Sequence, residues 1–306
     1  MSPHVCDLCS VAEFVVESIK KSLNTGKYDS DHSVAIIYRT NAQSRALEEA
    51  CVKNNLPYVI FGSATSFYKR QEIKDTLCFL RWLHNGRDRT SMLRAMTTPK
   101  RGIGEAAIAE FESYCSVVED YFDETYPGRT KPSSLDVLLS LSDHPETKTL
   151  GEFPPSPVGY ISSRPLKLFK EFSSQMRLIR TRALKEPLQN VLSTIIDEFE
   201  LIKHFDKISK SNSEYEERKA NVNELQQAAQ RYTAGGPCLR TSGSLENEEF
   251  IESPLGSFLD DVSLVTDLAD RSSGERFVAN FMTIHASKGM VSQSALLLVY
   301  GCRREL

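Results

Sequence analysis

The hydrophobic positions near the start of the chain follow an α/β pattern. Val34 to Ile37 form a short apolar run rich in β-branched side chains, which is typical of a buried strand in a parallel sheet. Thr40 and Gln43 then have the spacing of a capping box, and apolar residues recur at helical intervals over Asn41 to Asn54. A second strand is expected over Tyr58 to Phe61, so the pattern predicts a β-α-β unit with parallel strands and a right-handed crossover.

From Phe67 onward the apolar spacing becomes helical and remains so over most of the chain. Helices are expected over residues 166–183, 188–205, 214–232 and 255–268. Asp123 to Pro165 holds most of the prolines, together with Ser and Thr, and is expected to be a partly disordered surface insertion. A strand-like run over Phe277 to Ile284 returns to the α/β pattern. The prediction is therefore an α/β fold whose parallel sheet is interrupted by a large inserted all-helical body.

Composition narrows the class of protein. The chain has 306 residues, 40% hydrophobic and 25% charged, as in a soluble globular protein. The longest apolar run, Ala295 to Tyr300, is far shorter than the ~20 residues of a membrane-spanning helix, and residues 1–20 lack the features of a signal peptide. Seven scattered cysteines form no disulfide framework. We therefore expect an intracellular protein without a membrane partner.

One cysteine pair has the spacing of metal ligands. Cys6 and Cys9 are three positions apart, but no second CxxC or HxxxH follows them. A structural zinc site needs four ligands, so no metal site is predicted.

The net charge of −4 indicates no polyanionic partner for the chain as a whole, but charge is uneven locally. Between Phe67 and Arg101 there are nine basic residues and three acidic ones. The basic residues are Lys69, Arg70, Lys74, Arg81, Arg87, Arg89, Arg94, Lys100 and Arg101. Such a cluster suits contacts with phosphates, although by itself it is more often a solvated helix face.

Tyr38 and Arg39 follow the first predicted strand directly. Ligands of open α/β sheets bind beyond the carboxyl ends of the strands, so both residues are expected at the edge of a site. An aromatic ring can stack on a base, and a guanidinium can neutralise charge on a transferring phosphoryl group. Position alone also fits a half-buried tyrosine and an exposed arginine at a strand end.

A glycine-containing stretch, Thr98 to Gly104, lies directly before a predicted helix. Gly102 and Gly104 flank Ile103 and would let the backbone approach a phosphate, while the start of the helix attracts an anion. Lys100 and Arg101 add positive charge. Together with the preceding helix, the stretch looks like a helix-hairpin-helix element, which grips a duplex backbone without reading its sequence. The alternative is a tight turn with a glycine cap.

Three stretches together resemble the UvrD/PcrA/Rep type of superfamily 1 DNA helicases. Residues 38–45 resemble motif IV of that family, residues 98–104 its Gly-Ile-Gly stretch, and residues 282–289 its motif V. The resemblance implies that Tyr38 stacks on adenine and that Arg39 reaches the γ-phosphate of ATP. It also implies contacts with single-stranded DNA by Thr283, His285 and Gly289, and with duplex DNA by Lys100, Arg101, Gly102, Ile103 and Gly104.

The resemblance also implies a domain plan. Residues 1–66 would form the first part of the RecA-like subdomain 2A, residues 67–276 the helical subdomain 2B, and residues 277–306 an incomplete return to 2A. The flexible insertion, residues 123–165, lies outside the resemblance. The implied function is an ATP-dependent 3′→5′ DNA helicase of repair or recombination, which in a compartmented cell would be nuclear. Its partners would be single-stranded DNA, duplex or fork DNA, and an N-terminal motor domain that mainly holds ATP and Mg²⁺.

The sequence departs from the family pattern at functional positions. No glycine begins a Walker A loop, and Ile195 to Glu198 imitates a Walker B strand inside a run of helical period. Met290 and Val291 replace the family's Leu-Glu after motif V, and motif VI does not appear. We therefore expect a truncated, catalytically incomplete helicase. Two alternatives remain: a non-enzymatic DNA-binding or interaction module derived from a helicase gene, and a fragment without a stable fold.

Overall fold

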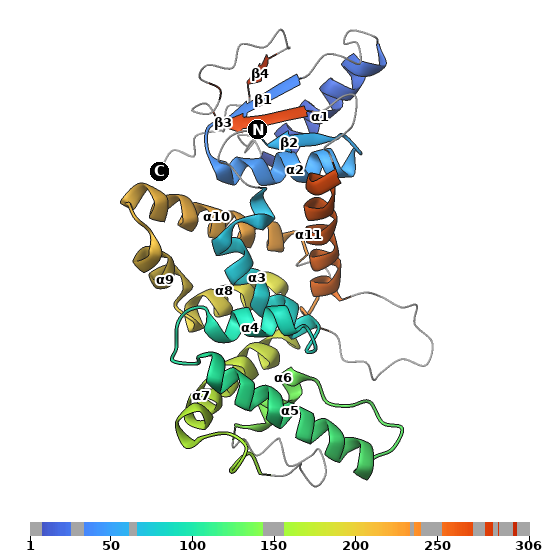
Figure 1. Cartoon of the computed structure of the whole chain (residues 1–306). Helices are drawn as coiled ribbons and strands as arrows, with labels where there is room; N and C mark the ends of the chain where they lie inside the picture. The colour runs from blue at the N-terminus through green and yellow to red at the C-terminus, as the bar shows by residue number, and fades with distance from the viewer. Residues whose placement is uncertain are drawn as a thin grey trace. The chain divides into compact units, whose positions relative to one another are not determined.

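The computed structural model describes residues 8–25, 34–60, 66–142, 156–232, 236–239, 253–271, 279–283, 287 and 296–298. The chain divides into two compact units. The sheet unit comprises residues 1–74, 209–225 and 259–306, and the helical unit comprises residues 75–208 and 226–258. Figure 1 shows the elements of both along the chain.

The sheet unit contains a four-stranded parallel sheet in the order β2-β3-β1-β4. The strands are β1 (Val34–Tyr38), β2 (Tyr58–Ile60), β3 (Ala279–Thr283) and β4 (Leu296–Leu298). The predicted α/β class and the parallel direction of the first two strands are confirmed. The strands β1 and β2 are not neighbours, because β3, from the far end of the chain, pairs between them.

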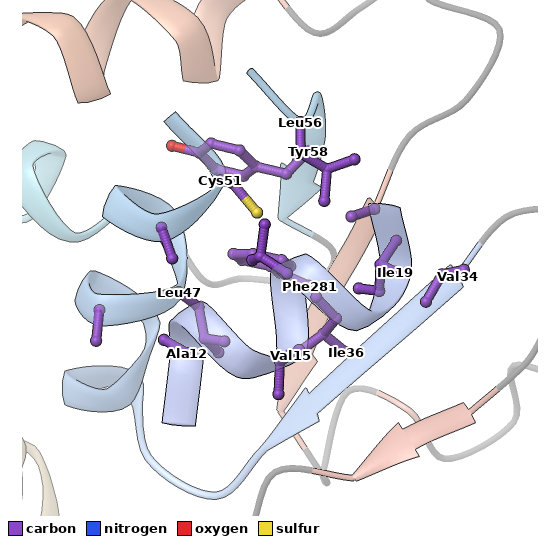
Figure 2. Packing of buried hydrophobic residues seen from close by; sticks show 14 of the residues in the cluster. Ala12, Val15, Ile19, Val34, Ile36, Leu47, Cys51, Leu56, Tyr58 and Phe281 are labelled. Carbon is purple, nitrogen blue, oxygen red and sulfur yellow. The ribbon is translucent and has the colours of Figure 1, made fainter. Parts of the chain in front are cut away.

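Two helices pack on one face of this sheet. They are α1 (Leu8–Asn24) and α2 (Ser44–Lys53), the latter preceded by the short 3-10 helix η1 (Asn41–Gln43). Their apolar side chains meet those of β1 and β3 in a continuous core, in which Val15, Leu47, Ile36 and Phe281 take part (Figure 2). Helix α1 was not predicted, although Ala12, Val15, Val16 and Ile19 recur at helical intervals and are buried.

The sheet unit also includes the 3-10 helix η2 (Phe67–Lys69) and parts of three longer helices. These are α3 (Gln71–His84), α10 (Asn212–Gln230) and α11 (Pro254–Arg271), and the division between the units falls within each of them. Residues 67–74, 209–225 and 259–271, which the predicted domain plan assigns to the helical subdomain, group with the sheet in this division, and the plan itself stays a prediction. Buried polar contacts give the physical reason: Arg45 of α2 bonds to Glu224 of α10, and Arg70 bonds to Asn221.

The helical unit is built mainly from α4 (Arg89–Thr97), α5 (Glu105–Thr125), α6 (Ser134–Ser140), α7 (Ser163–Ala183), α8 (Leu188–Glu198) and α9 (Leu201–Ile208). Its core is rich in fully buried aromatic rings, such as those of Phe79, Trp82, Phe111, Phe169 and Phe172. The predicted helix over 188–205 is split into α8 and α9. The break is at Glu200, whose φ of 49° is incompatible with a continuous right-handed helix.

Within the described residues, part of the segment 123–165, for which partial disorder was expected, is helical. Residues 123–125 end α5, residues 134–140 form α6, and residues 163–165 begin α7. A capping box between Ser133 and Asp136 starts α6, and its side chains Leu135, Val137 and Leu138 are buried. Pro127 follows the end of α5, Pro132 precedes the start of α6, and Pro165 lies in the first turn of α7, so these three prolines mark helix boundaries. Residues 143–155 lie outside the described part.

Among the described residues, no helix combines the length and the apolar character that crossing a membrane requires. The segment Ile195 to Glu198 lies in helix α8, as its helical period predicted, and does not form a Walker B strand.

Candidate functional site

Tyr38 and Thr283 are paired at the carboxyl ends of neighbouring parallel strands. The register of β1 and β3 aligns Val34 with Ala279 and ends on the pair Tyr38 and Thr283. Two stretches from opposite ends of the chain, singled out separately in the sequence, therefore reach the same edge of the sheet. Ligands of open α/β sheets bind at this edge.

The Tyr38 side chain is part of the core. Its exposed fraction is 0%, and its ring meets that of Phe281 edge-on, at 6.5 Å between centroids. Among the described residues, its hydroxyl has no hydrogen-bond partner. Burial, followed by the nearby Glu48, raises the pKa of this hydroxyl to about 12. Stacking on a base would need the ring to leave this position, so that role stays a prediction.

Arg39 lies beside Tyr38 and is exposed. The backbone N–H groups of Arg39 and Thr40 both donate to Oε1 of Gln43, at 3.0 and 3.1 Å, which fixes the turn after β1. The Gln43 side chain thus closes the loop that the sequence treated as a capping box. The result is an exposed guanidinium on an ordered turn at the ligand-binding edge of the sheet.

A buried polar network, which the sequence analysis did not find, joins α2 to the segment around η2. Glu48 is fully buried and accepts hydrogen bonds from Ser66 Oγ at 2.5 Å and from the Phe67 N–H at 3.0 Å. Burial raises the pKa of Glu48, and the bonds from Ser66 and Phe67 oppose that rise. Arg70 donates to Ser44 Oγ at 3.1 Å. Long-range pairing of this kind leaves no periodic signal in a sequence.

A second part of the network joins α2 to α10. Nε and Nη2 of Arg45 both donate to Oε1 of Glu224, at 2.8 and 2.5 Å, and Nη1 donates to Glu49 at 2.7 Å. The Arg45 and Glu224 side chains are 3% and 6% exposed. Arg45, which the sequence placed at the end of motif IV, therefore holds helices together within the sheet unit.

The residues at and beyond the end of β3, within the stretch 282–289, are only partly described. Thr283 is half-buried, and its carbonyl oxygen accepts a hydrogen bond from the Ser287 N–H at 3.0 Å. His285 and Gly289 lie outside the described residues. Their predicted contacts with single-stranded DNA stay predictions.

The glycine-containing loop, residues 98–104, belongs to the helical unit and leads into α5. Gly102 has a φ of 84°, which a residue with a side chain rarely adopts, and Gly104 is the N-cap of α5. Ile103 is 5% exposed and anchors the loop, whereas Lys100 and both glycines are exposed. The predicted combination of an accessible backbone, a helix start and a lysine is therefore present in the fold.

Arg101 departs from that picture, because its charge is turned inward. Its guanidinium lies 4.6 Å from the ring centre of Phe172 and 4.8 Å from that of Phe199. It donates to the carbonyl oxygens of Thr98 and Pro99, at 3.1 and 3.2 Å. Burial lowers its pKa to about 10, so it remains charged at neutral pH. In this geometry Arg101 fixes the shape of the loop rather than presenting a cation to a phosphate.

The basic cluster between Phe67 and Arg101 does not form one surface patch. Arg70 and Arg101 are engaged inside their units, as just described. Arg94 pairs with the buried Asp75 at 2.6 Å, and Arg89 pairs with Glu112 at 2.6 Å. The structure thus favours the solvated or internally paired interpretation for much of this cluster, with Lys100 exposed.

Chemically, the described edge of the sheet offers one exposed guanidinium for a phosphate. Among the described residues, no group of three or more His, Cys, Asp or Glu side chains is arranged to hold a metal ion. The Arg39 residue is exposed at this edge, while the buried Tyr38 ring does not present a face to a base in this conformation.

Comparison with known proteins places the chain in a family. A model of the UvrD-like helicase C-terminal domain matches residues 7–292. The ATP-dependent DNA helicase PcrA of Staphylococcus epidermidis is 32% identical over 283 residues, which cover 91% of this chain and 32% of that protein. PcrA of Staphylococcus aureus is 29% identical over 282 residues, with the same coverage of both proteins. This chain thus spans about a third of the length of the relatives it matches. The chain belongs to the DNA helicase family defined by the UvrD-like C-terminal domain.

Proposed function

We propose that this chain is part of an ATP-dependent DNA helicase that translocates 3′→5′ and unwinds duplex DNA in repair or recombination. Its sheet unit would supply the second motor domain's share of the nucleotide site, and its helical unit would bind duplex DNA. The observation that carries the proposal is the pairing of Tyr38 with Thr283, since it brings the Arg39 turn and the segment after β3 to one edge of the sheet.

In the nucleotide site, we assign the phosphate contact to Arg39. When bound, ATP with Mg²⁺ supplies the phosphoryl group whose hydrolysis drives translocation, and an N-terminal motor domain would mainly hold both. A guanidinium on a fixed turn can neutralise the charge that develops on that phosphoryl group. The two bonds from the backbone to Gln43 keep the Arg39 turn ordered before the nucleotide arrives. Tyr38 would contact adenine after a change in its ring position.

For DNA, the proposal has two sites. Thr283, with His285 and Gly289, would contact the single strand beyond the end of β3. In the helical unit, Lys100 and the backbone of Gly102, Ile103 and Gly104 would contact the phosphates of the duplex, with Arg101 holding the loop. Nuclear localisation, expected for a DNA helicase of a compartmented cell, stays a prediction.

The sequence contains no Walker A motif, so we propose that the chain by itself hydrolyses essentially no ATP. The test is an ATPase assay on the purified chain, with and without single-stranded DNA. Turnover at or near background is expected. DNA-stimulated turnover of about 1 s⁻¹ or more, the lower range for ordinary enzymes, would show that the chain is catalytically complete.

A chimaera tests the positive part of the proposal. The segment of Staphylococcus epidermidis PcrA that aligns with this chain is replaced by this chain, and DNA-stimulated ATPase is measured with Arg39 intact or changed to Ala. Loss of one phosphate-contacting arginine lowers the rate by roughly 10³-fold or more in related phosphoryl-transfer sites. An active chimaera that is indifferent to Arg39→Ala would contradict the assignment of this residue. Fork binding without any ATPase in an otherwise folded chimaera would favour the non-enzymatic DNA-binding module.

A further inference from the structure

Helix α7 carries an uneven charge that the sequence analysis did not single out. Over Ser163–Ala183 there are six basic residues and one acidic residue, Glu171. The basic residues are Arg164, Lys167, Lys170, Arg177, Arg180 and Arg182. A simple count of charge per helix would have detected this signal.

The basic residues in the C-terminal half of α7 hold the helical unit together. Arg180 pairs with Asp136 of α6 at 3.0 Å, and Arg182 donates to Thr194 Oγ1 of α8 at 3.0 Å. Arg177 donates to Ser142 Oγ at 2.8 Å. These three guanidinium groups therefore have structural partners, which accounts for their place on the helix.

The basic residues in the N-terminal half of α7 differ from those in its C-terminal half. Arg164 and Lys167 are exposed, and within the described part of the chain neither forms an ion pair with a carboxylate. Long cationic side chains on a rigid helix, presented to solvent without a structural partner, are suited to contacts with an external anion.

This half of α7 lies against the glycine-containing loop and the start of α5 (Figure 1). A Cβ placed on Gly102 would lie 3.3 Å from Leu168 Cδ1. The rings of Phe111 and Phe169 are 5.0 Å apart, and Ser162 donates to Glu110 of α5 through both its N–H and its hydroxyl, at 2.7 and 2.8 Å.

Helical geometry then brings Arg164 toward the loop. Arg164 precedes Leu168 by four residues, so both lie on the same side of α7, and Leu168 is the side chain that a Cβ on Gly102 would meet. Lys100 is two residues before Gly102 and is exposed. Arg164 therefore lies on the side of α7 that faces the loop, and Lys167 is its neighbour at i,i+3 on the helix.

We propose that Arg164 and Lys167 extend the loop into a larger surface for duplex DNA, contacting backbone phosphates together with Lys100. This inference rests on the proposed function and names residues that carry its DNA contact. Duplex DNA is the partner because cations fixed on a helix beside accessible backbone N–H groups suit a regular row of phosphates and read no bases.

The test measures binding of a fluorescently labelled 20-base-pair duplex by anisotropy, at salt concentrations from 50 to 200 mM. Each lost phosphate contact lowers the slope of log K against log salt by about 0.9 and weakens binding by roughly 5- to 10-fold at 0.1 M salt. Arg164→Ala and Lys167→Ala are each expected to show this effect. Lys185→Ala is the matched control, because Lys185 is exposed just beyond the other end of α7.

The outcomes separate the two proposals. If the unchanged chain does not bind duplex DNA, the proposed function fails for this unit. If it binds and Lys100→Ala weakens binding, but Arg164→Ala and Lys167→Ala do not, the inference about α7 is overturned and the proposed function stands. An equal loss for Lys185→Ala also overturns it, since the effect would then be one of net charge.

Folding of each variant is checked independently through Trp82. This is the single tryptophan of the chain, and its ring is 6.1 Å from that of Phe172 on α7. An unchanged emission spectrum and melting curve show that α7 is still packed. If an alanine variant fails this check, Arg164→Lys with Lys167→Arg gives a second measurement, in which the salt slope is expected to be retained.

Discussion

The guanidinium of Arg101 lies 4.6 Å from the ring centre of Phe172, and the residue is partly buried within the helical unit. Arg101, which the family resemblance implied as a contact for duplex DNA, thus holds the loop that carries Gly102. The same stretch contains Lys100, which is exposed. The two neighbours are therefore expected to behave differently when substituted.

Arg101→Lys is expected to lower the free energy of unfolding by about 1 to 2 kcal/mol, because a lysine keeps the charge but loses the planar contact with the rings. The measurement is urea unfolding followed by Trp82 fluorescence. DNA binding is expected to weaken as well, although no charge is removed. Wild-type stability and wild-type DNA binding in this variant would contradict the positioning role.

Lys100→Ala gives the matched comparison. Because Lys100 is exposed, its removal should change the free energy of unfolding by no more than about 0.5 kcal/mol. The salt dependence of duplex binding should fall by about one phosphate contact. If Lys100→Ala instead destabilises the fold as much as Arg101→Lys, the proposed division of labour between these residues is wrong.

Tyr38→Phe is expected to leave the sheet unit as stable as before, or more stable by about 1 kcal/mol. The Tyr38 hydroxyl is buried without a hydrogen-bond partner among the described residues, so removing it relieves a desolvation cost. Tyr58→Phe is the control, since the Tyr58 hydroxyl lies 3.4 Å from both Glu48 Oε2 and the Val265 carbonyl oxygen. Equilibrium unfolding in urea measures both. A clear loss of stability in Tyr38→Phe would show that the hydroxyl has a partner in solution.

Arg45→Met is expected to destabilise the protein by about 3 to 5 kcal/mol, because it leaves the carboxylate of Glu224 buried without its cation. Replacing both residues, in Arg45→Met with Glu224→Met, should cost much less than the sum of the single changes. The double-mutant cycle is read from urea unfolding. Additive effects would mean that the two side chains are not coupled.

Glu48 gives the sheet unit a predictable pH dependence. Its folded-state pKa is raised, so the folded state binds the proton more tightly than the unfolded chain does. The resulting stability is fully present below the unfolded pKa of about 4.5 and is lost as the pH rises through the folded pKa. Glu48→Gln should remove this part of the decrease in the free energy of unfolding with rising pH. Urea unfolding at pH 5, 6, 7 and 8 can measure it. An unchanged pH profile would argue against a raised pKa.

Much of the architecture was predictable because it depends on local patterns. The apolar run at Val34 to Ile37 and the helical spacing after it predicted β1 and α2 correctly, and the spacing around Ile195 identified a helix rather than a Walker B strand. The break at Glu200 was missed, because a single residue with positive φ interrupts a helix without interrupting the apolar period. Helix α6 was missed, because a proline next to a helix boundary, such as Pro132, gives the same local signal as a proline in a loop.

By itself, the sequence determined the parallel α/β class, the position of Tyr38 and Arg39 at the end of a strand, and the glycine loop before α5, since each depends on residues that are neighbours in the chain. Only the tertiary structure decided that Thr283 pairs with Tyr38, that Glu48 and Arg45 are buried in polar contacts, and that Arg101 is turned inward while Arg164 is exposed. The physical reason is that burial and pairing of a charge depend on side chains far away in sequence. An arginine side chain can therefore hold the fold together, as Arg101 does, or stay exposed, as Arg164 does.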